Sequence, residues 1–229
     1  LLIVRFNRFL ANCEAEQFID DILIKKLNVK HLVIGDDFHF GHDRIGTIKL
    51  LEAQGRKSGF ALESKHIKKK NNIYIKSSYI REQLYKGDVE GAARLLGRPY
   101  SITGLVVHGE ARGRKLGFPT ANIKQDDCVI LPSGIYVAYV FFGGKKFGAL
   151  CYIGQRPSFQ HINARISIEV YIMNYRGSLY GRTIEVELLK RVRPDVRFSD
   201  EKGLVGQINK DLLFAQKYFL ALKNRSSRA

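Results

Sequence analysis

The sequence predicts two parts of different fold class: an incomplete α/β unit with a doubly wound parallel sheet, and after it a small antiparallel β-barrel with a C-terminal helix. Before Arg98, short apolar runs alternate with helical patterns, which is typical of parallel sheets whose strands are joined by helices. After Pro99, short runs rich in β-branched and aromatic residues follow one another without helical patterns between them, which is typical of small barrels. The last apolar pattern has helical spacing.

The first part, residues 1–97, is expected to alternate strands and helices. Its strands are predicted at residues 1–4, 32–34 and 60–62, and its helices at 15–27, 48–54, 79–85 and 89–96. Gly55 and Gly97 are expected to end the helices that precede them. Because the chain opens in a strand-like run without a methionine, we expect the beginning of this unit to precede residue 1.

The second part, residues 98–229, is expected to hold the barrel. Its strands are predicted at residues 102–108, 135–142, 146–153, 166–172 and 184–190. Gly143 and Gly144 indicate a hairpin between two of these strands. The final helix is predicted from about Asp200 to Leu222 with Ser199 as its cap. Its apolar stripe consists of Leu204, Ile208, Leu212, Ala215 and Phe219.

Composition narrows the class of protein. A chain of 229 residues with 45% hydrophobic residues is long and apolar enough to bury a core, which excludes a disordered tail. No apolar run approaches the roughly 20 residues that a membrane span needs. Three widely spaced cysteines form no disulfide framework, so we expect a cytoplasmic protein. The net charge of +16 indicates an anionic partner, which is a nucleic acid, a membrane surface or a phosphorylated small molecule.

A glycine- and arginine-rich segment follows the first predicted barrel strand. Gly109 and Gly113 let backbone N–H groups approach phosphate oxygens, and Arg112 and Arg114 supply bidentate charge-assisted hydrogen bonds. The segment is not a Walker motif, and no helix is expected in it. The alternative interpretation is a hairpin turn without a ligand, since glycine-rich loops are common.

Oxygen-bearing side chains lie on two predicted extended segments. Thr120 and Asn122 are two residues apart, so they share one face and offer hard oxygen donors suited to Mg²⁺ and a nucleotide phosphate. Glu169 shares a face with Ser167 and Tyr171. A lone glutamate on a strand is usually only solvated; the functional alternative is a general base that deprotonates an alcohol attacking ATP.

The segment at residues 104–123 resembles the riboflavin kinase signature, whose GxPTAN core stands here at residues 117–122. Further segments match that family in order: residues 153–159 resemble its IGxRPTF turn, Glu169 its catalytic glutamate, residues 179–181 its LYG and residues 193–198 its RxExxF. Upstream, residues 35–41 with Arg44 and Gly46 resemble the GxDFxFG segment of bacterial FMN adenylyltransferases, and residues 76–81 their SSTxIR motif. Lys76, Ser158 and Asp195 depart from these patterns. The ordered series is similar to bifunctional bacterial riboflavin kinase/FMN adenylyltransferases.

The resemblance implies ATP-dependent phosphorylation of riboflavin to FMN by the barrel, and adenylylation of FMN to FAD by the first unit. It implies that Thr120 and Asn122 bind Mg²⁺ and ATP phosphates, that the loop at 109–114 closes over the nucleotide, and that Glu169 activates the riboflavin 5′-hydroxyl. Arg193 and Phe198 would contact the flavin, and Ser78 and Arg81 would bind phosphates of the adenylyltransferase reaction. The partners are then small molecules, and we expect neither a nucleic acid nor a membrane. Self-association is left open.

The HxGH motif of the adenylyltransferase family is not among the segments that match in order. The adenylyltransferase HxGH motif is expected at a helix N-terminus before residue 1, so we expect this chain to lack the second activity. His39–His42 spells HxGH, but its neighbours match the GxDFxFG segment, and we interpret it as a coincidence.

Two other functions are alternatives to flavin synthesis. One is a single-stranded nucleic-acid-binding barrel using Tyr139, Phe141, Phe142 and Phe147. The other is a barrel that only binds flavin, which Thr120, Asn122 and Glu169 argue against.

Overall fold

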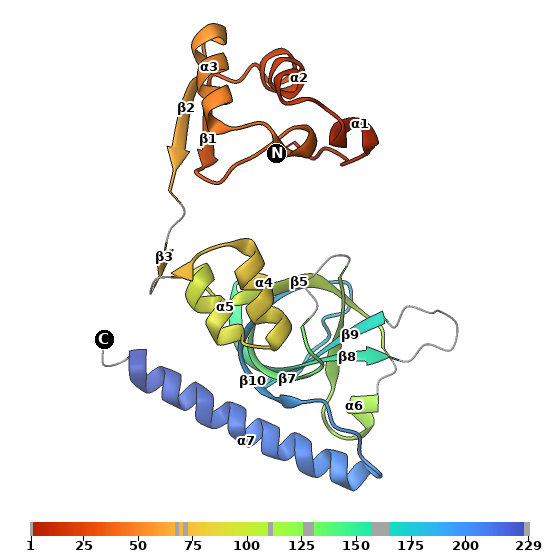
Figure 1. Cartoon of the computed structure of the whole chain (residues 1–229). Helices are drawn as coiled ribbons and strands as arrows, with labels where there is room; N and C mark the ends of the chain where they lie inside the picture. The colour runs from red at the N-terminus through yellow and green to blue at the C-terminus, as the bar shows by residue number, and fades with distance from the viewer. Residues whose placement is uncertain are drawn as a thin grey trace. The chain divides into compact units, whose positions relative to one another are not determined.

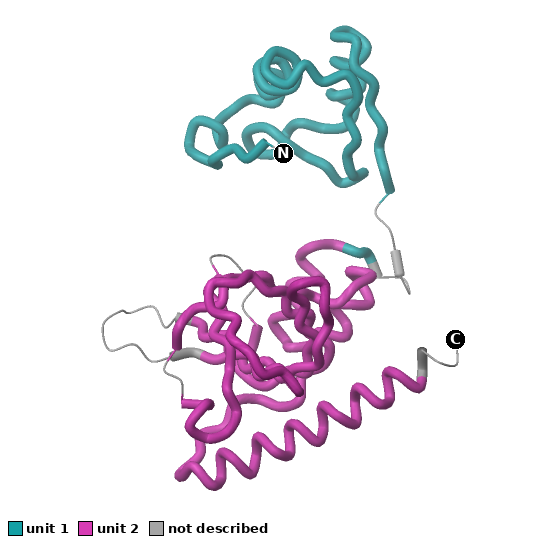
Figure 2. Tube along the Cα trace, turned by 180° about the vertical axis from the view of Figure 1, so that it is seen from behind, with its two compact units in different colours: residues 1–75 teal, residues 76–229 magenta. Residues whose placement is uncertain are grey.

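The computed structural model describes residues 2–66, 69–70, 73–109, 112–125, 131–156 and 165–226. They form two compact units, Leu1–Ile75 and Lys76–Ala229, which Figure 2 distinguishes by colour.

The first unit contains a two-stranded parallel sheet with helices (Figure 1). Its elements are α1 (Arg8–Ala11), α2 (Ala15–Gln17), the π-helix η1 (Phe18–Lys26), β1 (His31–Gly35), the 3₁₀ helix η2 (His42–Arg44), α3 (Ile48–Ser58), β2 (Ala61–Lys65), β3 (Lys69–Lys70) and β4 (Ile73–Tyr74). Strands β1 and β2 pair in parallel from His31 opposite Ala61 to Gly35 opposite Lys65, which confirms the parallel arrangement. Ile19, Leu51 and Phe60 are buried in its core.

Two predictions for this unit were wrong. Residues 2–4 form no strand, and Ile3 is 84% exposed. Helix α3 continues through Gly55 and ends at Gly59, whose φ of 77° is left-handed. Gly55 is buried against Phe60, and a Cβ atom there would lie 2.7 Å from the Phe60 carbonyl oxygen. The glycine therefore serves close packing of α3 rather than its termination.

The second unit is built on a closed antiparallel barrel, as predicted. Its strands are β5 (Tyr100–Val107), β6 (Thr120–Lys124), β7 (Gly134–Phe142), β8 (Lys145–Arg156), β9 (Arg165–Ile172) and β10 (Thr183–Pro194), and the barrel closes in the order β10-β5-β6-β9-β8-β7. Gly143 and Gly144 join β7 to β8 with φ values of 54° and 70°. Positive φ at both central residues is what a tight hairpin of this type requires, so the predicted hairpin is confirmed.

Helices α4 (Ser77–Lys86) and α5 (Val89–Leu96) belong to the same unit as the barrel. Leu84, Val89 and Ala92 are buried in the cluster that fills the barrel, and Lys190 on β10 pairs with Glu90 at 2.5 Å. The compact units therefore divide between Ile75 and Lys76, because the apolar face of this helical hairpin is buried by the barrel strands. The predicted domain boundary near Gly97 stays a prediction.

Helix α7 (Glu201–Ser226) lies along the barrel (Figure 1). Its predicted stripe is confirmed at Ala215, which is fully buried, and at Leu212 and Phe219, which pack against the same cluster. The capping residue is Asp200 rather than Ser199, since its Oδ1 accepts a hydrogen bond from the backbone N–H of Gly203 at 2.7 Å.

Candidate functional site

Strands β6 and β9 bring three predicted site residues together. In their antiparallel ladder Asn122 lies opposite Glu169, and Thr120 lies opposite Tyr171. The Thr120 hydroxyl is 3.2 Å from Glu169 Oε2, and the Ser167 hydroxyl is 3.2 Å from Oε1. Each carboxylate oxygen therefore accepts a hydrogen bond from one hydroxyl, which fixes the orientation of a half-buried glutamate.

The glycine-rich segment packs tightly against this ladder. A Cβ atom on Gly109 would lie 2.2 Å from Asn122 Nδ2, and one on Gly113 would lie 2.3 Å from the Phe118 carbonyl oxygen. Only glycine permits these approaches. Contrary to the prediction, the segment contains a short helix, α6 (Arg112–Lys115). It presents two arginines beside the ladder.

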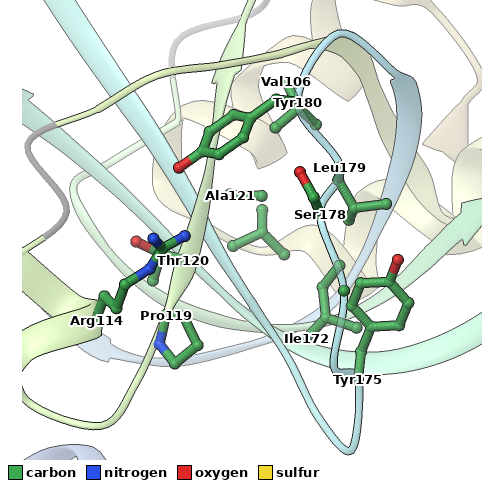
Figure 3. A pocket seen from close by; sticks show the side chains of 12 residues that line it. Val106, Arg114, Pro119, Thr120, Ala121, Ile172, Tyr175, Ser178, Leu179 and Tyr180 are labelled. Atoms are coloured by element: carbon green, nitrogen blue, oxygen red, sulfur yellow. The ribbon is translucent and has the colours of Figure 1, made fainter.

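A small cavity of about 70 Å³ lies on one side of Thr120. Arg114 and Tyr180 line it together with Thr120 (Figure 3). Figure 3 shows Arg114, Pro119 and Thr120 on one side of the cavity and Ile172, Leu179 and Tyr175 on the other. The cavity therefore has a cationic side chain on one side and apolar side chains on the other.

A larger cavity of about 390 Å³ is also lined by Thr120, together with Glu169 and Arg112. Its wall is mostly apolar, and the residues that contribute are Leu116, Phe118, Ile135, Leu150, Val196, Phe198, Leu204 and Ile208. An apolar cavity with a few polar groups at one end is typical of a site for an aromatic small molecule. Thr120 thus lies where the two cavities adjoin.

Arg193, predicted to contact a flavin, forms an ion pair at the wall of the larger cavity. Its Nε and Nη2 donate hydrogen bonds to the Asp211 carboxylate on α7 at 3.0 and 2.8 Å. Asp211 is only 2% exposed and also accepts a hydrogen bond from Gln207 at 2.9 Å. Phe198 lies with its ring centre 5.9 Å from the Arg193 guanidinium. Sequence reasoning missed Asp211, since an aspartate on a helix carries no local sign of a partner on β10.

The residues that resemble an adenylyltransferase are divided between the units. Ser78 and Arg81 are exposed on α4 in the second unit. The GxDFxFG-like segment is in the first unit, where Phe40 is buried and stacks on Phe38 with ring centres 5.6 Å apart. A Cβ atom on Gly46 would lie 2.6 Å from the Phe40 carbonyl oxygen, so close packing requires this glycine.

The two histidines of the HxGH-like sequence contact backbone carbonyls. His39 Nδ1 lies 3.0 Å from the Asp37 carbonyl oxygen, and His42 Nδ1 lies 3.2 Å from that of Ala11. Their interpretation as a coincidence stays a prediction. Pro157, Ser158 and Phe159 of the IGxRPTF-like turn lie outside the described residues.

The donor set beside Glu169 is suited to Mg²⁺. Within the described part of the chain, no three His, Cys, Asp or Glu side chains are grouped as a metal site. Mg²⁺ instead favours one or two carboxylates or neutral oxygens together with substrate phosphates. The Thr120 hydroxyl, held 3.2 Å from Glu169, and the neighbouring Asn122 fit that description.

Comparison with known proteins agrees with both parts. Residues 96–219 match the family model for riboflavin kinase, and residues 1–79 match that for FAD synthetase. The bifunctional riboflavin kinase/FMN adenylyltransferase of Buchnera aphidicola subsp. Schizaphis graminum is 42% identical over 96% of this chain and 71% of its own length. The chain belongs to the bifunctional riboflavin kinase/FMN adenylyltransferase family. Members from Bacillus subtilis and Escherichia coli K12 are each 39% identical over 97% and 96% of this chain, and 71% and 70% of their own lengths.

A solved structure shares the fold of this riboflavin kinase/FMN adenylyltransferase family member. It is titled a macrolide-efflux protein from Streptococcus pneumoniae, and its TM-score is 0.78 at 31% identity, over 92% of this chain and 67% of that chain. In the part of the family member that the structure describes, no helix combines the length and the apolar character required to cross a membrane.

Proposed function

We propose that the second unit transfers the γ-phosphoryl group of ATP to the 5′-hydroxyl of riboflavin at Thr120 and Glu169. Membership of the family supports the reaction. The observation that carries the assignment of residues is that Thr120 lines both cavities and lies 3.2 Å from the Glu169 carboxylate. Two substrates that occupy adjoining cavities meet at the residue that the cavities share.

The difference between the two cavities supports the following assignment of the substrates. The larger one has the apolar wall that an isoalloxazine ring requires, to which Phe118 and the α7 residues Leu204 and Ile208 contribute. Arg193 and Phe198 contribute to that wall. The smaller one is lined by Arg114 and receives the nucleotide. The terminal phosphate then meets Arg112 and the backbone of Gly113, which line the larger cavity near Thr120, and the backbone of Gly109.

Glu169 acts as the general base. Its carboxylate accepts the proton of the 5′-hydroxyl as the oxygen–phosphorus bond forms and the bond between the β–γ bridging oxygen and the γ-phosphorus breaks, which releases ADP. Thr120 and Asn122 would hold Mg²⁺, which supplies neutralisation of the phosphate charge. The hydroxyls of Thr120 and Ser167 orient the carboxylate.

Replacing Glu169 by Gln tests this role. Glutamine keeps the size and the hydrogen-bond acceptor but cannot take a proton, so kcat for FMN formation should fall by about 10²–10⁴-fold while ATP binding is retained. Glu185→Gln is the matched control, because Glu185 is a half-buried glutamate on β10 that lines neither cavity. A Glu169→Gln variant with normal turnover would show that another group removes the proton.

We propose that residues 1–97, with Ser78 and Arg81 as phosphate ligands, serve the adenylylation of FMN to FAD. The match of residues 1–79 to FAD synthetase supports this. In a chain that spans the full length of the family members, Arg81→Ala should then lower FAD formation from FMN and ATP and leave FMN formation unchanged. Equal loss of both activities would contradict the proposal. We also propose a cytoplasmic location, which is supported by the free, buried Cys13 and Cys151.

A further inference from the structure

A stacked pair of rings lies next to the kinase site and has no role in the steps above. The rings of His108 and Tyr180 are stacked with centroids 3.9 Å apart and planes 19° from parallel. His108 directly follows β5, and Tyr180 lines the smaller cavity. The chain beside each ring is fixed by backbone hydrogen bonds, from Gly181 N–H to the Val106 carbonyl and from Val106 N–H to the Arg182 carbonyl, both at 2.9 Å.

The stack stands at one end of a short series of contacts. His108 is followed by Gly109, whose α-carbon lies so close to Asn122 that an added Cβ would be 2.2 Å from Nδ2 and 2.4 Å from Cγ. Asn122 is paired with Glu169 across the β6–β9 ladder. A shift of the chain at His108 would therefore reach the Asn122 amide through Gly109.

The β5–β6 ladder ends where Val107 lies opposite Asn122, one residue before His108. Gly109 itself has no side chain to anchor it and is exposed. Among the described residues, the side chain adjacent in sequence to Gly109 is the ring of His108, which is therefore placed to hold the start of the loop. Offset or parallel stacking between two planar rings is a directional contact, which suits it to fixing an orientation.

We propose that His108 is a positioning residue for the kinase reaction: its stack on Tyr180 fixes the start of the basic loop and holds Gly109 against the Asn122 amide. The inference rests on the proposed kinase function. His108 acts through Asn122 and not on the substrates, and its planar ring, rather than its proton, is the property that the site uses.

Activity measurements on five variants separate these properties. His108→Ala and Tyr180→Ala should each lower kcat for FMN formation by about 10- to 100-fold, the scale expected for a displacement of about 1 Å at a reacting centre, with the KM for riboflavin unchanged. The double variant should be no slower than either single variant, since both remove one contact. His108→Phe and Tyr180→Phe should restore most of the activity, because both keep a planar ring.

The control is His66→Ala, since His66 is an exposed histidine of the first unit. Wild-type turnover in His108→Ala would overturn the proposal. So would a His108→Phe variant as slow as His108→Ala, because that result would require an imidazole nitrogen rather than a ring.

A second measurement does not depend on turnover. In the NMR spectrum, the side-chain NH₂ signals of Asn122 should shift in His108→Ala and return towards their wild-type positions in His108→Phe. Unchanged signals in His108→Ala would overturn the positioning role. If the wild-type chain formed no FMN while these shifts appeared as expected, the proposed function would fail and the positioning contact would stand.

Discussion

Gly109→Ala should separate catalysis from stability. A Cβ atom built at this position lies 2.2 Å from Asn122 Nδ2, 2.4 Å from Cγ and 2.6 Å from Oδ1. Non-bonded carbon and polar atoms require about 3.5 Å for an unstrained contact, so the amide must move by roughly 1 Å. A displacement of that size in a group that positions substrate lowers the rate by about 10²-fold.

The fold should tolerate the same substitution. Asn122 is a side chain that can rotate away, and alanine restricts the unfolded chain, which stabilises a compatible position by about 0.4–1 kcal/mol. Gly206→Ala on α7 is the matched control, because no atom lies within 4 Å of the added Cβ. Steady-state FMN formation and urea unfolding should be measured for both. Normal kcat in Gly109→Ala would refute the reasoning that Asn122 must stay in place.

Three further predictions concern stability. Asp211→Ala should lower the free energy of unfolding by about 3–5 kcal/mol in urea titrations, because it leaves the Arg193 guanidinium without its buried partner; a loss below 1 kcal/mol would contradict a buried pair. A chain of residues 76–229 should unfold cooperatively in thermal scans, whereas a chain of residues 98–229, which lacks α4 and α5, should be much less stable. Burial of each large apolar side chain of these helices contributes about 1.5–3 kcal/mol. Equal midpoints of thermal unfolding for the two chains would contradict this prediction. Burial raises the pKa of the Cys151 thiol from 9.0, its value in the unfolded chain, to about 12. The free energy of unfolding should therefore fall by about 1.4 kcal/mol per pH unit between those two values, because only the unfolded chain loses the thiol proton there. Cys151→Ala should flatten this slope of unfolding free energy against pH.

The barrel strands and the faces on which their side chains lie could be predicted because they follow local rules. The alternation of side chains along a strand places Ser167, Glu169 and Tyr171 on one face. For the same reason Thr120 and Asn122 share one face of another strand. The pairing of the two strands required the fold itself, because nothing in the spacing states that Asn122 lies opposite Glu169. The hairpin at Gly143 and Gly144 could be predicted for the same reason, because a tight turn depends on the residues that form it.

The features that could not be predicted depend on contacts distant in sequence. The helix at Gly55 continues because tertiary packing on Phe60 outweighs the low helix propensity of glycine. Helices α4 and α5 dock on the barrel because Leu84 is buried in the apolar cluster of the barrel. An amphipathic pattern predicts that a helix has an apolar face, but not which element that face packs against. Asp211 was missed for the same reason, since its partner is on another element.

A crystal structure of the chain with Mg²⁺, a non-hydrolysable ATP analogue and riboflavin tests the central claim most directly. We expect the flavin ring in the cavity of about 390 Å³ beside Leu204 and Ile208, and the nucleotide phosphates beside Arg114. The γ-phosphorus and the flavin 5′-oxygen should then meet next to Thr120, with the 5′-hydroxyl within hydrogen-bond distance of Glu169. A flavin bound elsewhere, or a γ-phosphate remote from Thr120, would contradict the account.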